Sequence, residues 1–335
     1  MTQSIDISLH NDPGGHSFPL CRPNSRLALK TVPEEIRVPV KAFSTDSPAE
    51  ILDFALQVAK SGCQVALCTL VEIRGGSSRP LGAHMAVASD GRYCGYVSGG
   101  CTEAAVAAEA LQAIETGHDR FVMLGEGSPF FDIVLPCGGG ITVAIHLLRY
   151  LEPISAVLEA MKSRKQAQLS YASGREALSL GATSAQTGWD GDTFVTSYRP
   201  AVRVVLFGRT LEVEMASKVA KAAGYEVVLY EHAAGDASVI DANTAVALLQ
   251  HDLELEMPVL EASLKARPFY IGALGSSRTH EKRVERLRES GHSDEAIDRI
   301  KAPIGLFGRA RDAHSLALSV VADIAASRQT ALMAD

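Results

Sequence analysis

Four short apolar runs, separated by segments with helical spacing, constrain the fold of the C-terminal part of the chain more than any other feature. The predicted strands are residues 202–207, 226–230, 244–249 and 269–274. The predicted helices are residues 211–223, a segment near 233–242, 259–265, 279–290 and 312–327. Strands that are apolar throughout are buried on both faces, and a helix after each strand lets the next one run parallel. The sequence therefore predicts an α/β domain built on a parallel sheet.

The turn after the first strand is where a Rossmann-type domain of this class holds a dinucleotide. Its G-x-G-x-x-G fingerprint uses glycines to let the pyrophosphate approach the backbone. Residues 208–213 read Gly-Arg-Thr-Leu-Glu-Val, so Gly208 is the one glycine kept. Thr210 would place a side chain where the pyrophosphate lies, and Glu212 would repel an anion. The turn thus disfavours NAD(P) in its usual pose, while Arg209 leaves a mononucleotide or a pterin phosphate open.

A second glycine turn follows the fourth strand. Residues 270–279 read Tyr-Ile-Gly-Ala-Leu-Gly-Ser-Ser-Arg-Thr and lead into a helix. The backbone N–H groups of a helix start, two hydroxyls and a guanidinium can together hold a phosphate. The same residues also suit an ordinary helix cap, with a hydroxyl at the N-cap and the arginine on the surface. The candidate binding residues here are Gly272, Gly275, Ser276 and Arg278.

The rest of the chain predicts an irregular arm, a smaller α/β domain and a connecting segment. The predicted helices are residues 48–62, 102–116 and 153–162. The predicted strands are residues 64–73, 84–89, 92–97, 120–124, 131–136 and 141–147, with a hairpin near 193–198. The predicted bounds are 1–46 for the arm, 47–163 for the N-terminal domain, 164–200 for the connection and 201–330 for the Rossmann-type domain. The predicted fold class is α/β, with the smaller α/β domain preceding the parallel-sheet domain.

Cys101 has the chemically most informative setting in the N-terminal domain. It follows Ser98, Gly99 and Gly100 at the junction of a predicted strand and a predicted helix. Glycines let the backbone approach a ligand closely, and the helix dipole favours the thiolate form of a cysteine at a helix start. A thiolate in this place can bind a soft metal or take part in sulfur transfer. The alternative is a small residue packed at a corner of the fold.

Two further glycine loops of this domain could converge on the same place. The first, residues 75–82, carries two hydroxyls and a guanidinium, which suit a phosphate or a pterin. The second is a Cys-Gly-Gly turn at residues 137–139. The candidate binding residues in these loops are Gly76, Ser77, Ser78, Arg79, Cys137 and Gly138.

The composition argues against several classes of protein. The net charge is −7, and the basic residues between 278 and 288 alternate with glutamates, which is typical of a solvated helix face. No stretch approaches the roughly 20 apolar residues of a membrane span. Residues 1–12 contain no Lys or Arg, unlike a signal or transit peptide. We therefore expect a cytoplasmic protein that binds neither nucleic acid nor a membrane.

The order and density of these motifs resemble the XdhC/CoxI family, the accessory factors of xanthine dehydrogenase and related molybdenum hydroxylases. The resemblance runs from about residue 48 to residue 328. It rests on residues 75–83, 98–103, 137–139, 251–255, 269–280 and 302–306. Members combine a small N-terminal domain with a Rossmann domain and are often dimeric, so the resemblance implies a homodimer.

The resemblance also implies a chaperone for the molybdenum cofactor, Mo-molybdopterin. Such a protein binds the cofactor while a cysteine desulfurase replaces a terminal oxo ligand by sulfur, and then delivers it to the apo-enzyme of a molybdenum hydroxylase. On this resemblance Cys101 is the metal ligand and the catalytic, sulfur-handling residue, and the loops 75–83 and 272–278 hold the pterin phosphate or nucleotide. The alternatives are an NAD(P)-dependent Rossmann oxidoreductase acting on a small substrate, and an interaction scaffold without a small ligand.

Overall fold

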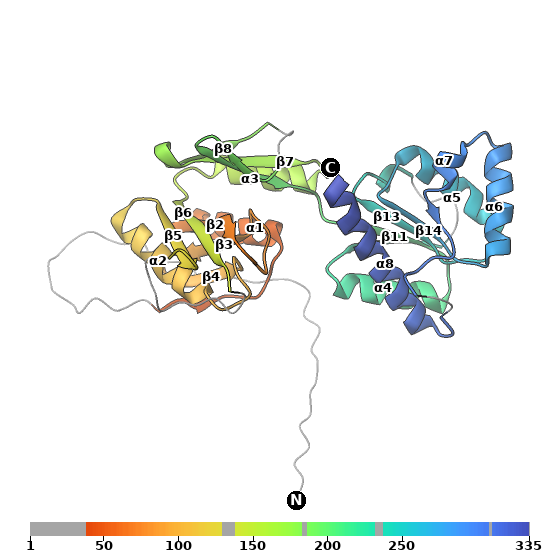
Figure 1. The fold of residues 1–335 in the computed structure, drawn as a ribbon, viewed down its shortest axis with the longest axis horizontal. Coiled ribbons are helices and arrows are strands. Elements are labelled where there is room, and N and C mark those ends of the chain that lie inside the picture. The colour runs from red at the N-terminus through yellow and green to blue at the C-terminus, as the bar shows by residue number, and fades with distance from the viewer. Residues whose placement is uncertain (1–37, 129–137, 183–185, 232–236, 308–309, 335) are drawn as a thin grey trace, which may run out of the picture. The chain divides into compact units, whose positions relative to one another are not determined.

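The chain folds into two compact units, which are described separately. A computed structural model describes residues 38–128, 138–182, 186–231, 237–307 and 310–334. The first unit ends at Tyr198 and the second begins at Arg199. Figure 1 shows the chain as a ribbon with its helices and strands labelled. The predicted strand at 131–136 and Cys137 lie outside the described residues.

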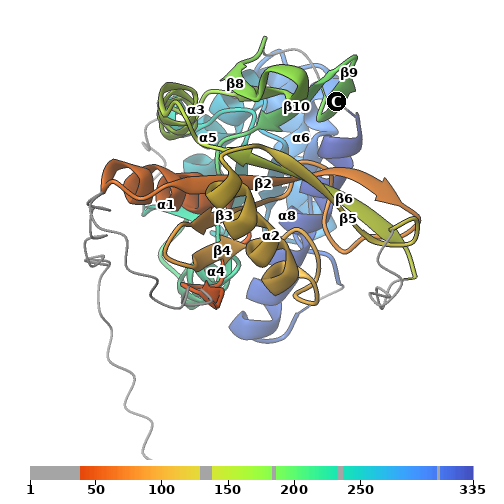
Figure 2. The same ribbon diagram turned by 90° about the vertical axis from the view of Figure 1, so that its left-hand side faces the viewer.

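A six-stranded sheet forms the centre of the first unit. Its strands are β1 (Val40–Lys41), β2 (Val65–Arg74), β3 (His84–Ala88), β4 (Arg92–Gly95), β5 (Arg120–Gly125) and β6 (Gly140–Leu147). The strand order is β1-β4-β3-β2-β6-β5, and β1 alone runs parallel to its neighbour within this sheet. The two long helices beside this sheet are α1 (Pro48–Lys60) and α2 (Glu103–Thr116), which are labelled with β2 to β6 in Figure 2.

Alternation of side chains along the strands gives this sheet two buried faces. On β2, Cys68 and Leu70 belong to the core that α2 covers, whereas Val65 and Leu67 belong to the cores that α1 covers. Successive residues of a strand point to opposite faces, so an apolar strand can serve both cores. This explains why the continuous apolar run 64–73 forms a central strand.

A second sheet in the first unit occupies the segment that the sequence predicts to be a connection. Its strands are β7 (Ala167–Ala172), β8 (Ala177–Leu180), β9 (Gly188–Asp190) and β10 (Thr193–Tyr198), with the short helix η1 (Ser173–Arg175). They pair antiparallel in the order β8-β7-β10-β9. The helix α3 (Glu152–Lys162) packs against β7 through a shared core. Tyr171 and Phe194 join Val71 and Ala144 of the larger sheet in another core.

The second unit confirms the predicted parallel α/β architecture. Its strands are β11 (Arg203–Phe207), β12 (Glu226–Tyr230), β13 (Thr244–Leu248), β14 (Tyr270–Ala273) and β15 (Ile300–Lys301). All pairs are parallel in the order β12-β11-β13-β14-β15. The helices are α4 (Leu211–Ala222), η2 (Ala237–Val239), α5 (Leu253–Ala266), α6 (Ser277–Glu289), α7 (Asp294–Ile297) and α8 (Ala313–Ala334). One face is covered by α4 and α8, the other by α5 and α6.

Helix α5 begins six residues before the predicted start at 259. Asp252 is its N-cap, and the carboxylate accepts hydrogen bonds from the N–H groups of Glu254 and Leu255 at 3.0 and 3.4 Å. Pro258 lies inside the helix and masks its beginning in the sequence, because proline normally marks a boundary. Among the described helices, none is long and apolar enough to cross a membrane.

Candidate functional site

Three glycine loops of the first unit lie against one another, as the sequence led us to expect. A Cβ atom on Gly139, just before β6, would lie 2.5 Å from the carbonyl oxygen of Arg74 and 2.7 Å from that of Gly76, just after β2. A Cβ atom on Gly99, after β4, would lie 3.1 Å from the hydroxyl oxygen of Ser78. The loops after β2 and β4 and the loop before β6 therefore share one surface, on which only glycine permits the close backbone approach at residue 139.

Cys101 is exposed at this surface and precedes Thr102, the N-cap residue of α2. Its sulfur lies 3.6 Å from the hydroxyl oxygen of Ser98. Gly99 and Gly100 are exposed as well, and Gly100 adopts a positive φ of 106° that favours glycine. The thiol can therefore be reached from solvent, and bare backbone lies beside it.

The buried side chain of Glu103 anchors the loop that carries Cys101 through hydrogen bonds. The sequence alone did not predict this role. Its carboxylate accepts hydrogen bonds from the Ser98 N–H at 2.8 Å, from the Ser98 hydroxyl at 2.9 Å and from the Thr102 N–H at 3.2 Å. Its side chain is buried and belongs to the first residue of α2, where the helix dipole favours a negative charge. The buried Thr102 hydroxyl has no partner among the described residues.

The loop after β2 holds its own shape through Ser77. The Ser77 hydroxyl accepts a hydrogen bond from the Arg79 N–H at 3.2 Å and donates one to the Arg79 carbonyl at 2.9 Å. Gly76 and Ser78 are exposed, and so is Gly138 in the loop before β6. These residues can contact a ligand, and Cys137 next to them lies outside the described residues.

In the second unit, Gly208 lies at the carboxyl end of β11. It has a positive φ of 133°, and a Cβ atom there would lie 3.0 Å from the carbonyl oxygen of Leu249, which follows β13. The Thr210 hydroxyl donates a hydrogen bond to the same carbonyl at 3.3 Å. Strands β11 and β13 flank the point where the strand order reverses, which is where parallel α/β sheets bind ligands. Thr210 thus spans the two loops at the place where a dinucleotide would enter.

The residues of the second glycine turn have two different roles, packing within the sheet and capping of α6. Gly272 lies within β14, and a Cβ atom there would lie 2.6 Å from the side chain of Ile304. Gly275 has a positive φ of 135°, and Ser276 caps α6 by accepting a hydrogen bond from the Thr279 N–H at 3.3 Å. Arg278 is exposed. The structure therefore brings Gly275, Ser276 and Arg278 to the carboxyl edge of the sheet and buries Gly272 in its core.

A buried ion pair stands behind this turn. The guanidinium of Arg283 on α6 contacts the carboxylate of Glu256 on α5 at 2.6 and 3.0 Å, and it also donates to the carbonyl of Leu274. Both side chains are almost completely buried. This pair links α5 and α6 near the end of β14. No sequence pattern predicts the pair, because each residue alone is typical of a solvent-exposed helix face.

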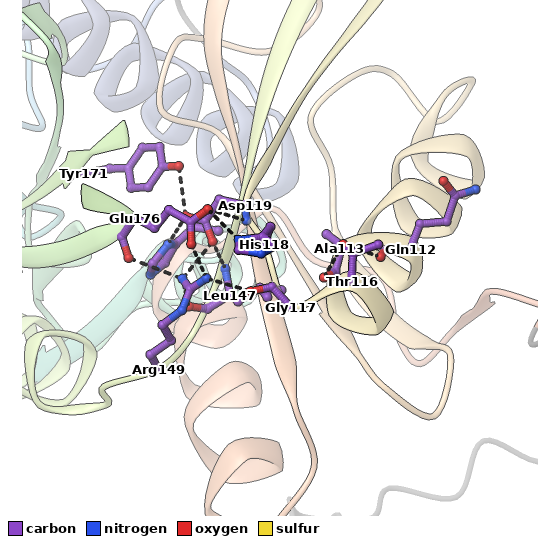
Figure 3. A network of polar contacts seen from close by, with 11 residues as sticks. Gln112, Ala113, Thr116, Gly117, His118, Asp119, Leu147, Arg149, Tyr171 and Glu176 are labelled. Atoms are coloured by element: carbon purple, nitrogen blue, oxygen red, sulfur yellow. Dashed lines mark hydrogen bonds and ion pairs between the residues drawn. The ribbon is translucent and has the colours of Figure 1, made fainter. Parts of the chain in front are cut away.

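A polar network around Asp119 joins the two sheets of the first unit (Figure 3). The carboxylate of Asp119, which precedes β5, accepts from His146 at 2.6 Å, from Arg149 at 2.8 Å and from the Tyr171 hydroxyl at 2.9 Å. Burial alone would raise the pKa of Asp119, but these contacts outweigh it and lower the pKa to about 2. Since the donors come from β6, the segment after it and β7, the network has a structural role.

The predicted site residues fall into two groups, one in each unit. The group in the first unit surrounds Cys101, and the group in the second unit lies at the carboxyl edge of the parallel sheet. Within the described residues, no three His, Cys, Asp or Glu side chains are grouped so that they could hold a metal ion. Among the free cysteines of the described residues, Cys68 and Cys94 are buried and Cys101 is exposed.

Comparison with known proteins gives matches over most of the chain. Residues 58–125 match the XdhC and CoxI family, and residues 204–324 match the XdhC Rossmann domain. The chain is 50% identical over 291 residues to the molybdenum cofactor insertion chaperone PaoD of Escherichia coli, covering 87% of this chain and 92% of PaoD. It is 25% identical to the uncharacterized E. coli protein YqeB, covering 81% of this chain and 44% of YqeB.

A solved structure shows a related fold. The crystal structure of a xanthine dehydrogenase from Bacillus halodurans matches with a TM-score of 0.63 at 18% identity, covering 84% of this chain and 96% of that chain. The family matches and the extensive identity to PaoD confirm the resemblance drawn from the motifs. The chain belongs to the XdhC and CoxI family.

Proposed function

We propose that this protein binds the molybdenum cofactor and inserts it into a molybdenum hydroxylase of the xanthine dehydrogenase type. The observation that carries this proposal is the 50% identity to PaoD, a molybdenum cofactor insertion chaperone, over nearly the whole of both chains. At such identity, binding surfaces as well as the fold are commonly shared. We also propose that the client is such an enzyme, that the protein is located in the cytoplasm and that it forms a homodimer.

The surface around Cys101 fits such a cofactor. When bound, the cofactor supplies molybdenum and a dithiolene, and a cysteine sulfur is a soft ligand suited to such a metal. Cys101 is exposed, Gly99 and Gly100 leave open backbone beside it, and the orphan hydroxyl of Thr102 lies buried next to it. Cys101 would bind the metal and handle sulfur, and a cysteine desulfurase would be the partner that supplies this sulfur.

Each unit has further candidate binding residues of its own. In the first unit these are Gly76, Ser77, Ser78, Arg79, Ser98, Gly99, Gly100, Cys137 and Gly138. In the second unit they are Gly208, Gly275, Ser276 and Arg278, with Gly272 acting through packing behind them. Exposed hydroxyls such as that of Ser78, N–H groups at a helix start and the exposed guanidinium of Arg278 are suited to the phosphate of the pterin or to a nucleotide.

The test is the molybdenum and pterin content of the protein purified from a host that makes the cofactor. We expect the wild type to carry molybdenum, measured by ICP-MS, and the Cys101→Ala variant to lose most of it. The variant Cys94→Ala, which removes a buried thiol of the core, should retain the wild-type amount. Retention of molybdenum by Cys101→Ala would exclude Cys101 as the ligand, and a wild type without molybdenum or pterin would exclude the function.

The alternative of an NAD(P)-dependent oxidoreductase is tested separately. Thr210 donates to the Leu249 carbonyl across the turn that a dinucleotide would need to enter. We therefore expect NAD(H) and NADP(H) to change the melting temperature by less than about 1 °C at concentrations that would stabilise a true binder by several degrees. A stabilisation of several degrees by one of these cofactors would favour the oxidoreductase.

A further inference from the structure

We propose that a pocket beside the glycine loops of the first unit binds a flat, neutral heterocycle through a 2-amino-4-oxopyrimidine edge, such as that of a pterin. This inference rests on the proposed function and assigns the pterin ring of the cofactor to this pocket. The pocket has a volume of about 360 Å³, within the range of small-molecule sites. It is lined among others by Asp46, Arg79, Tyr96, His84 and Tyr198.

A carboxylate and a guanidinium stand side by side at this pocket. A guanidinium nitrogen of Arg79 lies 2.7 Å from the carboxylate of Asp46, whose side chain is 69% exposed and therefore accessible to a ligand. The Nε of Arg79 is buried and has no acceptor among the described residues. A 2-amino-4-oxopyrimidine presents N–H donors next to a carbonyl acceptor on one edge. Such an edge complements Asp46 as acceptor and Arg79 as donor at the same time.

The charge of the pocket favours a neutral ring over a phosphate. Asp46 offsets the charge of Arg79 through their ion pair. The imidazole of His84 is buried and bonded to the Tyr198 hydroxyl at 2.6 Å, and burial lowers its pKa to about 4, so it is uncharged at neutral pH. The rest of the lining includes apolar side chains such as Ile51. A phosphate would find one guanidinium that is already paired, whereas a neutral ring finds apolar walls and a polar edge.

Tyr96 provides an aromatic wall in a fixed position. The Arg79 guanidinium lies 5.3 Å from the centre of the Tyr96 ring. The Tyr96 hydroxyl donates to the Ser44 hydroxyl at 3.1 Å and accepts from the Lys41 ammonium at 3.0 Å. The ring is thus held by residues of β1 and the segment after it, which is the end of the predicted arm. Aromatic faces and guanidinium planes stack well on flat heterocycles.

The test is a fluorescence titration of the full chain, purified from a host that cannot make the cofactor, with pterin as the probe. Lumazine, which has an oxo group in place of the 2-amino group, is the matched ligand. We expect pterin to bind about tenfold more tightly than lumazine, because the amino group bonds to the carboxylate. Asp46→Asn should weaken pterin binding about tenfold and leave lumazine unchanged. The control Asp53→Asn changes an exposed carboxylate on α1 and should alter neither.

Three outcomes would overturn the pocket assignment. Equal affinity for pterin and lumazine would show that the amino edge is not recognised. Equal weakening by Asp46→Asn and Asp53→Asn would show that the carboxylate at the pocket has no special role. Tighter binding of guanosine, which presents the same edge, than of pterin would instead support the recognition of this edge and identify a guanine nucleotide as its source. Arg79→Lys, which keeps the charge, should weaken both pteridines, and unchanged binding would also count against the pocket.

The failure of this inference can be told apart from the failure of the proposed function. The same variants are purified from a cofactor-replete host, and their molybdenum content is measured. If the wild type carries molybdenum but binds pterin and lumazine equally, the proposed function is supported and the pocket assignment is wrong. If the wild type binds pterin more tightly than lumazine but carries no molybdenum, the pocket assignment is supported and the proposed function is wrong.

Discussion

At the scale of single residues, Glu103 determines the shape of the loop that carries Cys101. Its carboxylate accepts three hydrogen bonds from Ser98 and Thr102 in a buried place. Glu103→Ala leaves the buried Ser98 N–H without its acceptor and leaves the Thr102 N–H with only the longer contact to the Ser98 hydroxyl at 3.4 Å. We expect the free energy of unfolding to fall by about 2–4 kcal/mol in urea titrations.

The matched control is Glu115→Ala on the same helix, where the side chain is exposed. We expect it to change the free energy of unfolding by less than about 0.5 kcal/mol. In addition, Glu103→Ala should increase the rate at which Cys101 reacts with a thiol reagent, since the loop loses its anchor. Equal stability of the two variants would mean that the loop does not depend on the carboxylate.

The sequence identifies Cys101 and the glycines around it, because their chemistry and conformational freedom are local properties. Gly139 is constrained by the backbone of Arg74 and Gly76, and the Cys-Gly-Gly turn indicates this. Glu103 and Asp46 were missed for a physical reason. Each acts through a hydrogen bond or an ion pair with another residue, and such a contact forms only in the folded chain.

At the scale of elements, two buried groups join the sheets of the first unit and respond to pH in different ranges. His84 on β3 bonds to Tyr198 on β10, and its folded pKa of about 4 lies below the ordinary value of 6.5. Between these values the unfolded chain binds a proton that the folded chain does not. The free energy of unfolding should therefore fall by about 3 kcal/mol from pH 6.5 to pH 4 through this residue.

The contribution of His84 is measured against a surface histidine. His84→Gln should flatten the pH dependence of stability between pH 4 and 6.5, whereas His118→Gln, with a side chain 78% exposed, should leave it as in the wild type. Asp119 acts at lower pH. Its folded pKa of about 2 lies below 3.8, so its contribution is complete above pH 3.8 and is lost as the pH falls towards 2. An unchanged pH profile in His84→Gln would contradict the assignment.

The ion pair between α5 and α6 gives a second prediction at this scale. Glu256→Gln would leave the fully buried guanidinium of Arg283 without its counter-charge. We expect a loss of about 3–5 kcal/mol in the free energy of unfolding, measured by circular dichroism in urea. Glu254→Gln breaks the exposed pair with Arg286 on the same two helices and should cost less than about 1 kcal/mol. Equal losses would mean that burial does not set the strength of the pair.

The elements of the second unit are largely predictable, and part of the first unit is not. Continuous apolar strands such as 203–207 and 244–248 carry their signal within a few residues. The strands β8 and β9 are short and partly exposed, so their pattern is too weak to distinguish them from a connection. They form because β7 and β10 pair with them and pack on the larger sheet.

At the scale of the whole molecule, each unit contains complete cores of its own. In the first unit both faces of the larger sheet are covered, one of them in part by the sheet β7–β10. In the second unit helices cover both faces of the parallel sheet. A chain with two self-sufficient cores can carry the Cys101 surface in one unit and the carboxyl edge of the parallel sheet in the other, and each can change without unfolding the other unit.

Separate expression of the two units tests this independence and the position of the domain boundary. We expect residues 38–198 and 199–335 each to unfold cooperatively on heating, and the fluorescence of Trp189, the one tryptophan of the chain, to report the first piece alone. Residues 38–163, which end at the boundary predicted from sequence, lack β7–β10. That piece would expose Val71, Ala144 and the face of α1 that carries Leu52, so we expect it to aggregate or to melt without cooperativity. Cooperative melting of residues 38–163 at the temperature of residues 38–198 would instead place the boundary at 163 and make the second sheet an appendage.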